Sequence, residues 1–128
     1  MDLQIVDRVA LVLAGGGGLG RAIALDLAAE GAKVAIAGRH EQSIAETGAA
    51  IQAAGGRHLA LTWDLGELAL VEERIGAVES AHGPVDILVN ITGGPPPTPA
   101  SETTTEAWAE QFQKMVLSVI AIIGLRWT

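Results

Sequence analysis

A glycine-rich run near the N-terminus narrows the fold of this chain at once. It comprises Gly15, Gly16, Gly17, Gly18, Leu19 and Gly20. The run follows a continuous apolar stretch, residues 8–14 (RVALVLA), as expected for a strand buried on both faces. A helical pattern comes next, with Leu19, Ile23 and Leu27 on one face and Gly31 placed to end the helix in a left-handed conformation. The glycine run is therefore the turn between a buried strand and a helix.

A turn of this kind is suited to holding a phosphate group. Residues without side chains let the backbone approach an anion, which then meets free amide N–H groups and the positive end of the helix dipole. Two registers fit the glycines: Gly15-x-Gly17-x-x-Gly20, the general dinucleotide fingerprint, and Ala14-x-x-x-Gly18-x-Gly20. Both registers place a nucleotide at the same helix end, and a purely structural turn is the alternative to both.

Strand and helix patterns alternate along the chain. Further strands are predicted at residues 33–37 (KVAIA), 58–62 (HLALT) and 85–90 (VDILVN), and helical patterns separate them. Such alternation specifies a parallel sheet with crossover helices on both faces. The predicted fold class is α/β, a Rossmann-type doubly wound parallel sheet truncated to about four strands in the order 3-2-1-4. We expect residues 1–128 to form a single domain of this type, about half of a complete fold.

The helices are predicted from their apolar spacing. A helix over residues 41–54 places Ile44 and Ile51 inward. The next helix carries a stripe of four apolar residues: Leu68, Val71, Ile75 and Val78.

The last part of the chain begins with a loop that contains four prolines. Residues 91–99 (ITGGPPPTP) exclude both a helix and a central strand. Thr103 and Glu106 have the spacing of a capping box and predict the start of a last helix. The apolar positions of that helix are Trp108, Phe112, Met115, Val119 and Ile122 or Ile123.

The end of the second strand indicates the type of cofactor. A carboxylate there would accept a hydrogen bond from a ribose 2′-hydroxyl and would repel a 2′-phosphate. The chain has Arg39 instead, and a guanidinium pairs with a phosphate through two charge-assisted hydrogen bonds. We therefore predict NADP rather than NAD, with an ordinary solvated arginine as the alternative.

Two further polar residues follow predicted strands. Asp64 comes after the third strand, where its carboxylate would accept from the exocyclic amino group of an adenine or would cap the helix that begins near Gly66. Asn90 ends the fourth strand, where its amide would hold neighbouring strands, a ribose or a turn. Both alternatives remain open for Asp64, and all three remain open for Asn90.

Composition excludes several other functions. The chain has no cysteine, which removes disulfides and thiolate chemistry and favours a reducing, cytoplasmic location. Its formal net charge of −7 and lack of a basic run argue against nucleic acids and anionic membranes as partners. The apolar run 115–125 falls well below the roughly 20 residues of a membrane-spanning helix. The three histidines lack metal-ligand spacing and no serine has a nucleophile-elbow setting, so neither a metal site nor a serine hydrolase is expected.

The motifs together resemble the short-chain dehydrogenase/reductase superfamily, and most closely its 3-oxoacyl-carrier-protein reductase-like branch. The residues that carry the resemblance are ALVLAGGGGLGRAIALDLAAEGAKVAIAGR, the pair Asp64-Leu65, and VDILVN followed by Gly93. It extends over residues 8–123, nearly the whole chain. The resemblance implies an NAD(P)-dependent hydride transfer that interconverts an alcohol and a ketone.

The resemblance also assigns roles to residues. The family's glycine loop corresponds to Ala14, Gly18, Leu19 and Gly20. Its basic residue for the 2′-phosphate corresponds to Arg39, and its acidic adenine position to Asp64, followed by Leu65. Its Asn-Asn-Ala-Gly motif keeps only its first and last members. The expected cofactor-binding residues are Gly15, Gly16, Gly17, Gly18, Leu19, Gly20, Arg39, Asp64, Leu65, Asn90 and Gly93.

The chain also departs from the family in its catalytic residues. The family's catalytic asparagine corresponds to Met115, and the family's serine and Tyr-x-x-x-Lys have no counterpart in a chain without tyrosine. Residues 124–128 (GLRWT) no longer resemble the family. We therefore expect a truncated or frameshifted product that has no catalytic residues of its own. Reading the downstream DNA in all frames tests this, because the lack of an encoded Tyr-x-x-x-Lys would contradict it.

Two functional hypotheses follow. By resemblance, the chain belongs to an NADP(H)-dependent oxidoreductase; alternatively, it is a non-catalytic nucleotide-binding or oligomerising fragment of such an enzyme. The missing tyrosine favours the second hypothesis for the 128 residues themselves. The strand at 85–90 presents an apolar edge that is unpaired without a fifth strand, so we expect a homo-oligomer.

Overall fold

The computed structural model describes the backbone of residues 1–126 and the side chains of residues 1–124. Trp127 and Thr128, part of the divergent ending, lie outside the described residues. Four parallel strands form one sheet: β1 (Val9–Leu13), β2 (Lys33–Gly38), β3 (Arg57–Thr62) and β4 (Ile87–Val89). Their order is β3-β2-β1-β4, which confirms the predicted topology.

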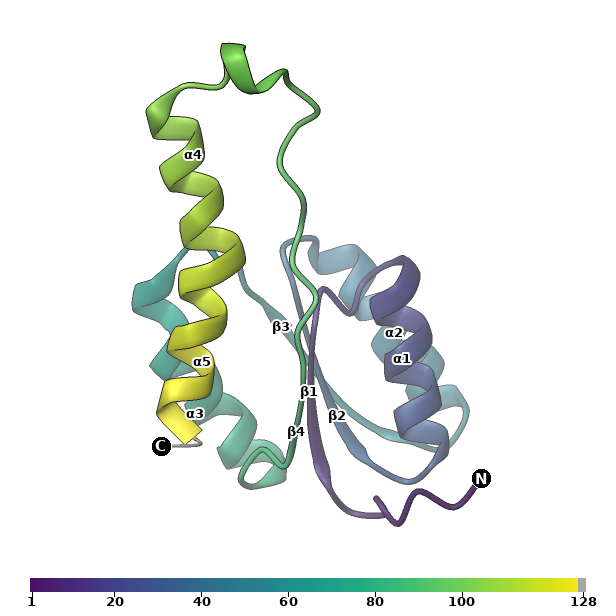
Figure 1. Cartoon of the computed structure of the whole chain (residues 1–128). Coiled ribbons are helices and arrows are strands. Elements are labelled where there is room, and N and C mark those ends of the chain that lie inside the picture. The colour runs from purple at the N-terminus through teal and green to yellow at the C-terminus, as the bar shows by residue number, and fades with distance from the viewer. Residues whose placement is uncertain (127–128) are drawn as a thin grey trace.

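Helices cover both faces of the sheet (Figure 1). α1 (Gly18–Ala29) and α2 (Glu41–Ala53) lie on one face. The other face carries α3 (Val71–His82) and α5 (Ser118–Arg126). A 3-10 turn, Leu68–Leu70, directly precedes α3.

Strand β1 is buried along its whole length, because both faces of the central sheet are covered. Leu11 and Leu13 belong to the core cluster that contains α3 and α5 residues such as Ile75 and Ile122. Val12 belongs to the opposite cluster, which contains Ile44 of α2. Alternate residues of β1 therefore face two different cores, one on each side of the sheet, which explains why every position of the strand is apolar.

Helix α1 differs from the prediction in the face that it buries. Leu19 is 66% exposed, whereas Gly20 and Ala24 are the buried residues of the helix. A Cβ atom on Gly20 would collide with the carbonyl oxygen of Ala14, so the helix begins in direct contact with the end of β1. This close approach requires a small residue at the start of the helix, whereas Leu27 of the predicted stripe packs partly buried against the core cluster of Val12 and Ile44. Gly31 has the predicted left-handed conformation, with φ +90°.

The last helical segment is α4 (Thr105–Phe112), a π-helical turn at Gln113–Leu117, and then α5. A short 3-10 turn, Ala100–Glu102, precedes it. The predicted cap at Thr103 is wrong by one residue: Thr104 is the N-cap, and its hydroxyl accepts from the N–H of Ala107 at 3.1 Å. The Thr103 hydroxyl instead donates to the Pro99 carbonyl, which removes it from the helix end.

The predicted apolar face of this last segment is only partly buried. Trp108 and Phe112 are 56% and 54% exposed, whereas Ser118 and Ile122 are buried. Figure 1 shows the reason: α4 stands beyond the carboxyl ends of the strands, and only α5 lies beside α3. An apolar residue in α4 therefore has no sheet surface beneath it.

Strand β4 is shorter than the predicted 85–90 because a side chain takes over part of its pairing with β1. The Val9 N–H donates to the Asp86 carboxylate at 2.9 Å, and the Asp86 N–H donates to the Val9 carbonyl at 2.8 Å. The backbone ladder then begins at Ala10 and Ile87.

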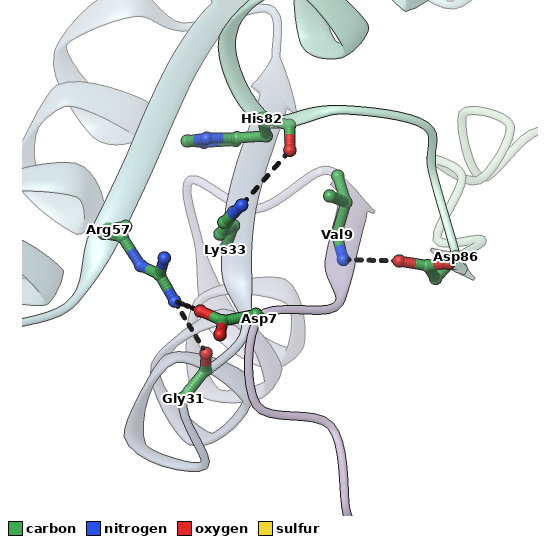
Figure 2. A network of polar contacts seen from close by, with 7 residues as sticks. All are labelled: Asp7, Val9, Gly31, Lys33, Arg57, His82 and Asp86. Atoms are coloured by element: carbon green, nitrogen blue, oxygen red, sulfur yellow. Dashed lines mark hydrogen bonds and ion pairs between the residues drawn. The ribbon is translucent and has the colours of Figure 1, made fainter.

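A network of polar contacts closes the amino edge of the sheet (Figure 2). Arg57 forms an ion pair with Asp7 and also donates to the Gly31 carbonyl, while the Lys33 ammonium approaches the His82 carbonyl at 3.5 Å. The hydrogen bond and charge of Arg57 lower the pKa of Asp7. Burial, followed by the nearby Lys33 charge, lowers the pKa of His82. The network thus joins the loops that precede all the strands.

Membrane-spanning helices and metal-ligand clusters are both absent from the described residues. Within residues 1–126, no helix has the length and apolar character needed to cross a membrane. The same residues contain no group of three or more potential side-chain ligands that could hold a metal ion.

Candidate functional site

A cavity of about 730 Å³ lies at the carboxyl edge of the sheet. Residues that follow each of the four strands line it: Ala14 after β1, Arg39 after β2, Asp64 after β3 and Gly93 after β4. Residues of α4 and the π-helical turn line its other side. The cavity therefore lies at the reversal of strand order between β1 and β4, where doubly wound sheets bind ligands.

The six residues of the glycine-rich run have different roles. Gly16 and Gly17 line the cavity, whereas Gly15, Gly18, Leu19 and Gly20 do not. A Cβ atom on Gly15 would collide with the Ile36 side chain, so Gly15, like Gly20, is required for packing. A Cβ atom on Gly17 would meet no atom within 4 Å. The space over Gly17, at the N-cap of α1, is thus open to a ligand group.

Backbone conformation adds constraints at positions of the glycine-rich run. Ala14 and Gly18 have φ +54° and +48°, both in the left-handed region. Gly20 has no room for a Cβ atom because the Ala14 carbonyl approaches it. Strict demands therefore fall on positions of both registers: Ala14, Gly18 and Gly20 in one, and Gly15 and Gly20 in the other. Ala14 occupies a conformation that glycine adopts more easily.

Arg39 and Asp64 line the cavity from neighbouring strands, and Leu65 lines it next to Asp64. Arg39 is exposed and has no ion pair or side-chain hydrogen bond to residues 1–126. The Oδ1 atom of Asp64 accepts from the Gly66 N–H at 2.9 Å. The Glu67 N–H also donates to the Asp64 carbonyl, so Asp64 closes a turn at the position where the helix was expected to begin. The 3-10 turn Leu68–Leu70 follows, and α3 itself begins at Val71.

The two predicted binding residues after β4, Asn90 and Gly93, differ in their relation to the cavity. Gly93 lines the cavity, but Asn90 is exposed and does not line it. Strand β4 ends at Val89, so the chain has left the sheet at Asn90.

Sequence reasoning missed the wall that α4 and the π-helical turn supply. Glu110, Gln111 and Lys114 line the cavity there, and the Lys114 ammonium pairs with Glu110 at 2.7 Å. The spacing of Glu110 and Lys114 signals an ion pair within a helix. It does not signal the cavity, because the loop at 91–104 must first bring the helix back toward the loop that follows β3. Ser43 and Trp63 are further lining residues that were not predicted.

The fold and cavity define an α/β protein of the doubly wound type with a cavity at the switch point of its sheet. Comparison with known proteins makes this more specific. The family model for short chain dehydrogenase matches residues 8–125. The short-chain dehydrogenase/reductase homolog YusS of Bacillus subtilis is 42% identical over 89 residues, which cover 69% of this chain and 82% of YusS. The chain therefore belongs to the short-chain dehydrogenase/reductase family.

Solved structures give the same result for the fold. The L-sorbose reductase of Gluconobacter frateurii, complexed with NADPH and L-sorbose, matches with a TM-score of 0.91 and 27% identity. This match covers 97% of the present chain and 48% of the reductase. A short chain dehydrogenase of Burkholderia cenocepacia in complex with NADP has a TM-score of 0.88 and 31% identity, with 94% and 49% of the two chains covered. The chain thus spans about half of these two proteins, and 41–44% of several of the curated relatives that it matches.

Proposed function

We propose that these residues form the nucleotide-binding part of an NADP(H)-dependent short-chain oxidoreductase that interconverts an alcohol and a ketone. The observation that carries the proposal is the cavity at the switch point, where the glycine loop, Arg39 and Asp64 converge from three different strands. Two structurally similar proteins are complexed with NADPH or NADP, which supports the same class of ligand. A 3-oxoacyl group as substrate is the narrower form of the proposal.

The residues of the cavity fit a 2′-phosphorylated adenine dinucleotide. The open space over Gly17 accepts the pyrophosphate at the N-terminus of α1, where the helix dipole is favourable for an anion. The unpaired guanidinium of Arg39 binds the 2′-phosphate, and Asp64 accepts from the adenine amino group. NADP, when bound, supplies or accepts the hydride, and the residues named here bind and orient it.

Calorimetric titration with NADP and NAD tests the proposal. We expect NADP to bind more tightly than NAD, and Arg39→Ala to reduce NADP affinity by about tenfold or more while changing NAD affinity little, because hydrogen bonds to charged groups contribute about 1.5–3 kcal/mol. Arg8→Ala is the matched control, since Arg8 lies before β1 at the opposite edge of the sheet. Equal NADP affinities of the wild type and Arg39→Ala would remove Arg39 from the site.

We further propose that the 128 residues bind the nucleotide without turnover. They contain no tyrosine to act as the family's general acid or base. Met115, at the position of the family's catalytic asparagine, does not line the cavity. An assay of NADPH oxidation with a panel of ketones tests this, and turnover above background would establish these residues as a catalyst in their own right.

A further inference from the structure

Two basic side chains begin neighbouring strands at the amino edge of the sheet. Lys33 is the first residue of β2 and Arg57 the first residue of β3, and the parallel register pairs them with each other. Two residues further along these strands, Ala35 belongs to the core cluster on the α3 face and Leu59 packs against it. Because every second side chain of a strand points to the same face, Lys33 and Arg57 are directed to that face as well. Two like charges therefore begin adjacent strands side by side, which is destabilising unless a negative charge lies near them.

The end of α3 brings His82 to the same place (Figure 2). His82 lies in the last turn of α3, and its carbonyl oxygen is 3.5 Å from the Lys33 ammonium. The imidazole Nε2 atom is buried and has no hydrogen-bond partner in the part of the chain that the structure describes. Burial lowers the pKa of His82, and the charges of Lys33 and Arg57 lower it further, so both cations act on the imidazole. Three nitrogen groups thus converge from β2, β3 and α3.

The polar contacts of this group leave several donors unused. Within the described residues, both hydrogen bonds of Arg57 use its Nη2 atom, which donates to Asp7 and to the Gly31 carbonyl, so Nη1 and Nε keep their hydrogens. The Lys33 ammonium forms no ion pair with these residues and has two N–H donors besides the one directed at His82. Asp7 supplies one negative charge, and Arg57 already pairs with it. The group therefore has more positive charge and more donors than these contacts satisfy.

A tetrahedral oxyanion with two charges is complementary to these groups. Its oxygens accept from an ammonium and from a guanidinium at once through charge-assisted hydrogen bonds, and its charge separates the two cations. We propose that Lys33, Arg57 and His82 form a binding site for a phosphate-like dianion at the amino edge of the sheet. The cavity lies at the carboxyl edge, so this site is distinct from the proposed nucleotide site and does not depend on it. Because the three residues come together only in the folded chain, the bound anion stabilises the fold.

A structural tie is the competing explanation for Lys33, because its contact with the His82 carbonyl joins β2 to α3 without any ligand. The two roles predict opposite effects of Lys33→Met, which keeps the apolar stem and removes the ammonium. Loss of a tie lowers stability in every buffer. Loss of an anion site relieves the repulsion between Lys33 and Arg57 when no anion is present, and it removes the stabilisation that the anion provides.

Titration of the full chain with sodium sulfate, followed through backbone amide chemical shifts, tests the site. Sulfate retains two charges at neutral pH, and sodium chloride at the same ionic strength controls for screening. We expect saturable shifts at Lys33, Arg57 and His82 in the millimolar range, and none of comparable size in chloride. A parallel titration with glycerol phosphate distinguishes two sources of the anion. Tighter binding than sulfate indicates a phosphate ester of a larger molecule, and equal or weaker binding indicates a free ion.

Three variants locate the charges that bind the anion. Lys33→Met should weaken sulfate binding by about tenfold, because it removes a charge-assisted hydrogen bond. Asp7→Asn should strengthen sulfate binding several-fold, because the Asp7 carboxylate competes for Arg57. Arg8→Met is the matched control, since it removes one positive charge from the same edge, where Arg8 is paired with Asp86 at 3.6 Å. This control should change the sulfate affinity by less than about twofold, because a charge outside the site acts only through the screened solvent.

Four outcomes would overturn the inference. Equal shifts in sulfate and chloride would show screening only, and sulfate shifts confined to Gly16 and Gly17 would place the anion in the nucleotide cavity. Unchanged sulfate affinity in Lys33→Met would remove Lys33 from the site. Lower stability of this variant in sulfate-free buffer, measured by urea denaturation, would make Lys33 a structural tie. If Lys33→Met does not fold, Asp7→Asn decides, because unchanged or weaker sulfate binding in that variant contradicts the site.

Discussion

Gly17 and Gly20 stand three residues apart in the glycine loop, but different physical constraints act on them. Gly20 is buried at the start of α1, where the Ala14 carbonyl leaves no room for a Cβ atom. Gly17 has extended backbone, with φ −150°, and open space where its side chain would be. Gly20 is therefore needed for packing, whereas Gly17 keeps the cavity open.

Substitution by alanine should affect stability at Gly20 but ligand binding at Gly17. Gly20→Ala should lower the free energy of unfolding by about 1–3 kcal/mol, because the added methyl group forces α1 away from β1. Gly17→Ala should change the free energy of unfolding by less than about 0.5 kcal/mol but weaken NADP binding several-fold. Urea denaturation and calorimetry measure the two effects. A stable Gly20→Ala variant would show that the helix adjusts at no cost.

His82 should make stability depend on pH through its lowered pKa. Because burial disfavours its charged form in the folded protein, the unfolded chain takes up the proton first as the pH falls below the ordinary value of 6.5. The free energy of unfolding should therefore decrease from pH 7 to pH 5. The titration of Asp7 lies below its ordinary value of 3.8 and does not overlap this window.

Denaturation across this pH range in His82→Gln checks the assignment. The variant should show a shallower decrease in the free energy of unfolding than the wild type. His40→Gln, which replaces an exposed histidine at the rim of the cavity, is the control for the loss of one imidazole. Identical slopes in the wild type and His82→Gln would contradict the role of His82.

At the scale of elements, the last helical segment begins one residue later than its sequence pattern predicts, and the preceding loop is the reason. Thr103 has the capping-box spacing, but its hydroxyl bonds to the Pro99 carbonyl within the preceding 3-10 turn. The neighbouring Thr104 then has the extended backbone of an N-cap and accepts from Ala107. The hydrogen bonds of the loop therefore decide which threonine begins the helix.

The assignment predicts unequal effects of neighbouring threonines. Thr104→Ala should lower the free energy of unfolding by about 1 kcal/mol, because it leaves an N–H of the first helical turn without its acceptor. Thr105→Ala, at the first helical position, should cost less than about 0.5 kcal/mol. Urea denaturation measures both. An equal cost for the two would argue against Thr104 as the cap.

At the scale of the whole molecule, the two edges of the sheet have different properties. The amino edge carries the polar network of Figure 2, which ties together the loops before the strands. The carboxyl edge is hollow and is lined by glycines and by side chains of both charges. The polar contacts and the cavity therefore lie at opposite edges of the sheet.

Self-association remains a prediction from the sequence. Several large apolar side chains of α4, the π-helical turn and α5 are exposed, and β4 pairs with β1 alone among the described strands. Light scattering should give a mass above the 13.2 kDa of one chain, and Ile120→Lys should reduce it because it places a charge on this surface. Leu19→Lys, an exposed position on the opposite helical layer, should not. A monomeric wild type across micromolar concentrations would contradict the prediction.

The strand pattern and glycine loop were sufficient to predict the order 3-2-1-4 and the edge at which the cavity lies. The burial of Ile44, Ile51, Ile75 and Val78 also agreed with their spacing. The buried face of α1 could not be predicted, because Leu19, Ile23 and Leu27 form an equally regular stripe. In the structure, Gly20 contacts the Ala14 carbonyl and Leu27 packs against the core, whereas Leu19 is exposed.

The sequence by itself determined the elements, their parallel arrangement and the chemistry at the strand ends, because these depend on local periodicity and on residue type. Tertiary structure decided which residues share the cavity. Asn90 lies outside it, while Glu110 and Lys114 enter it after the chain has passed through the proline-rich loop and returned. That return depends on long-range contacts such as Gln113 with Gly66, and no local pattern specifies the direction in which a loop brings a helix back.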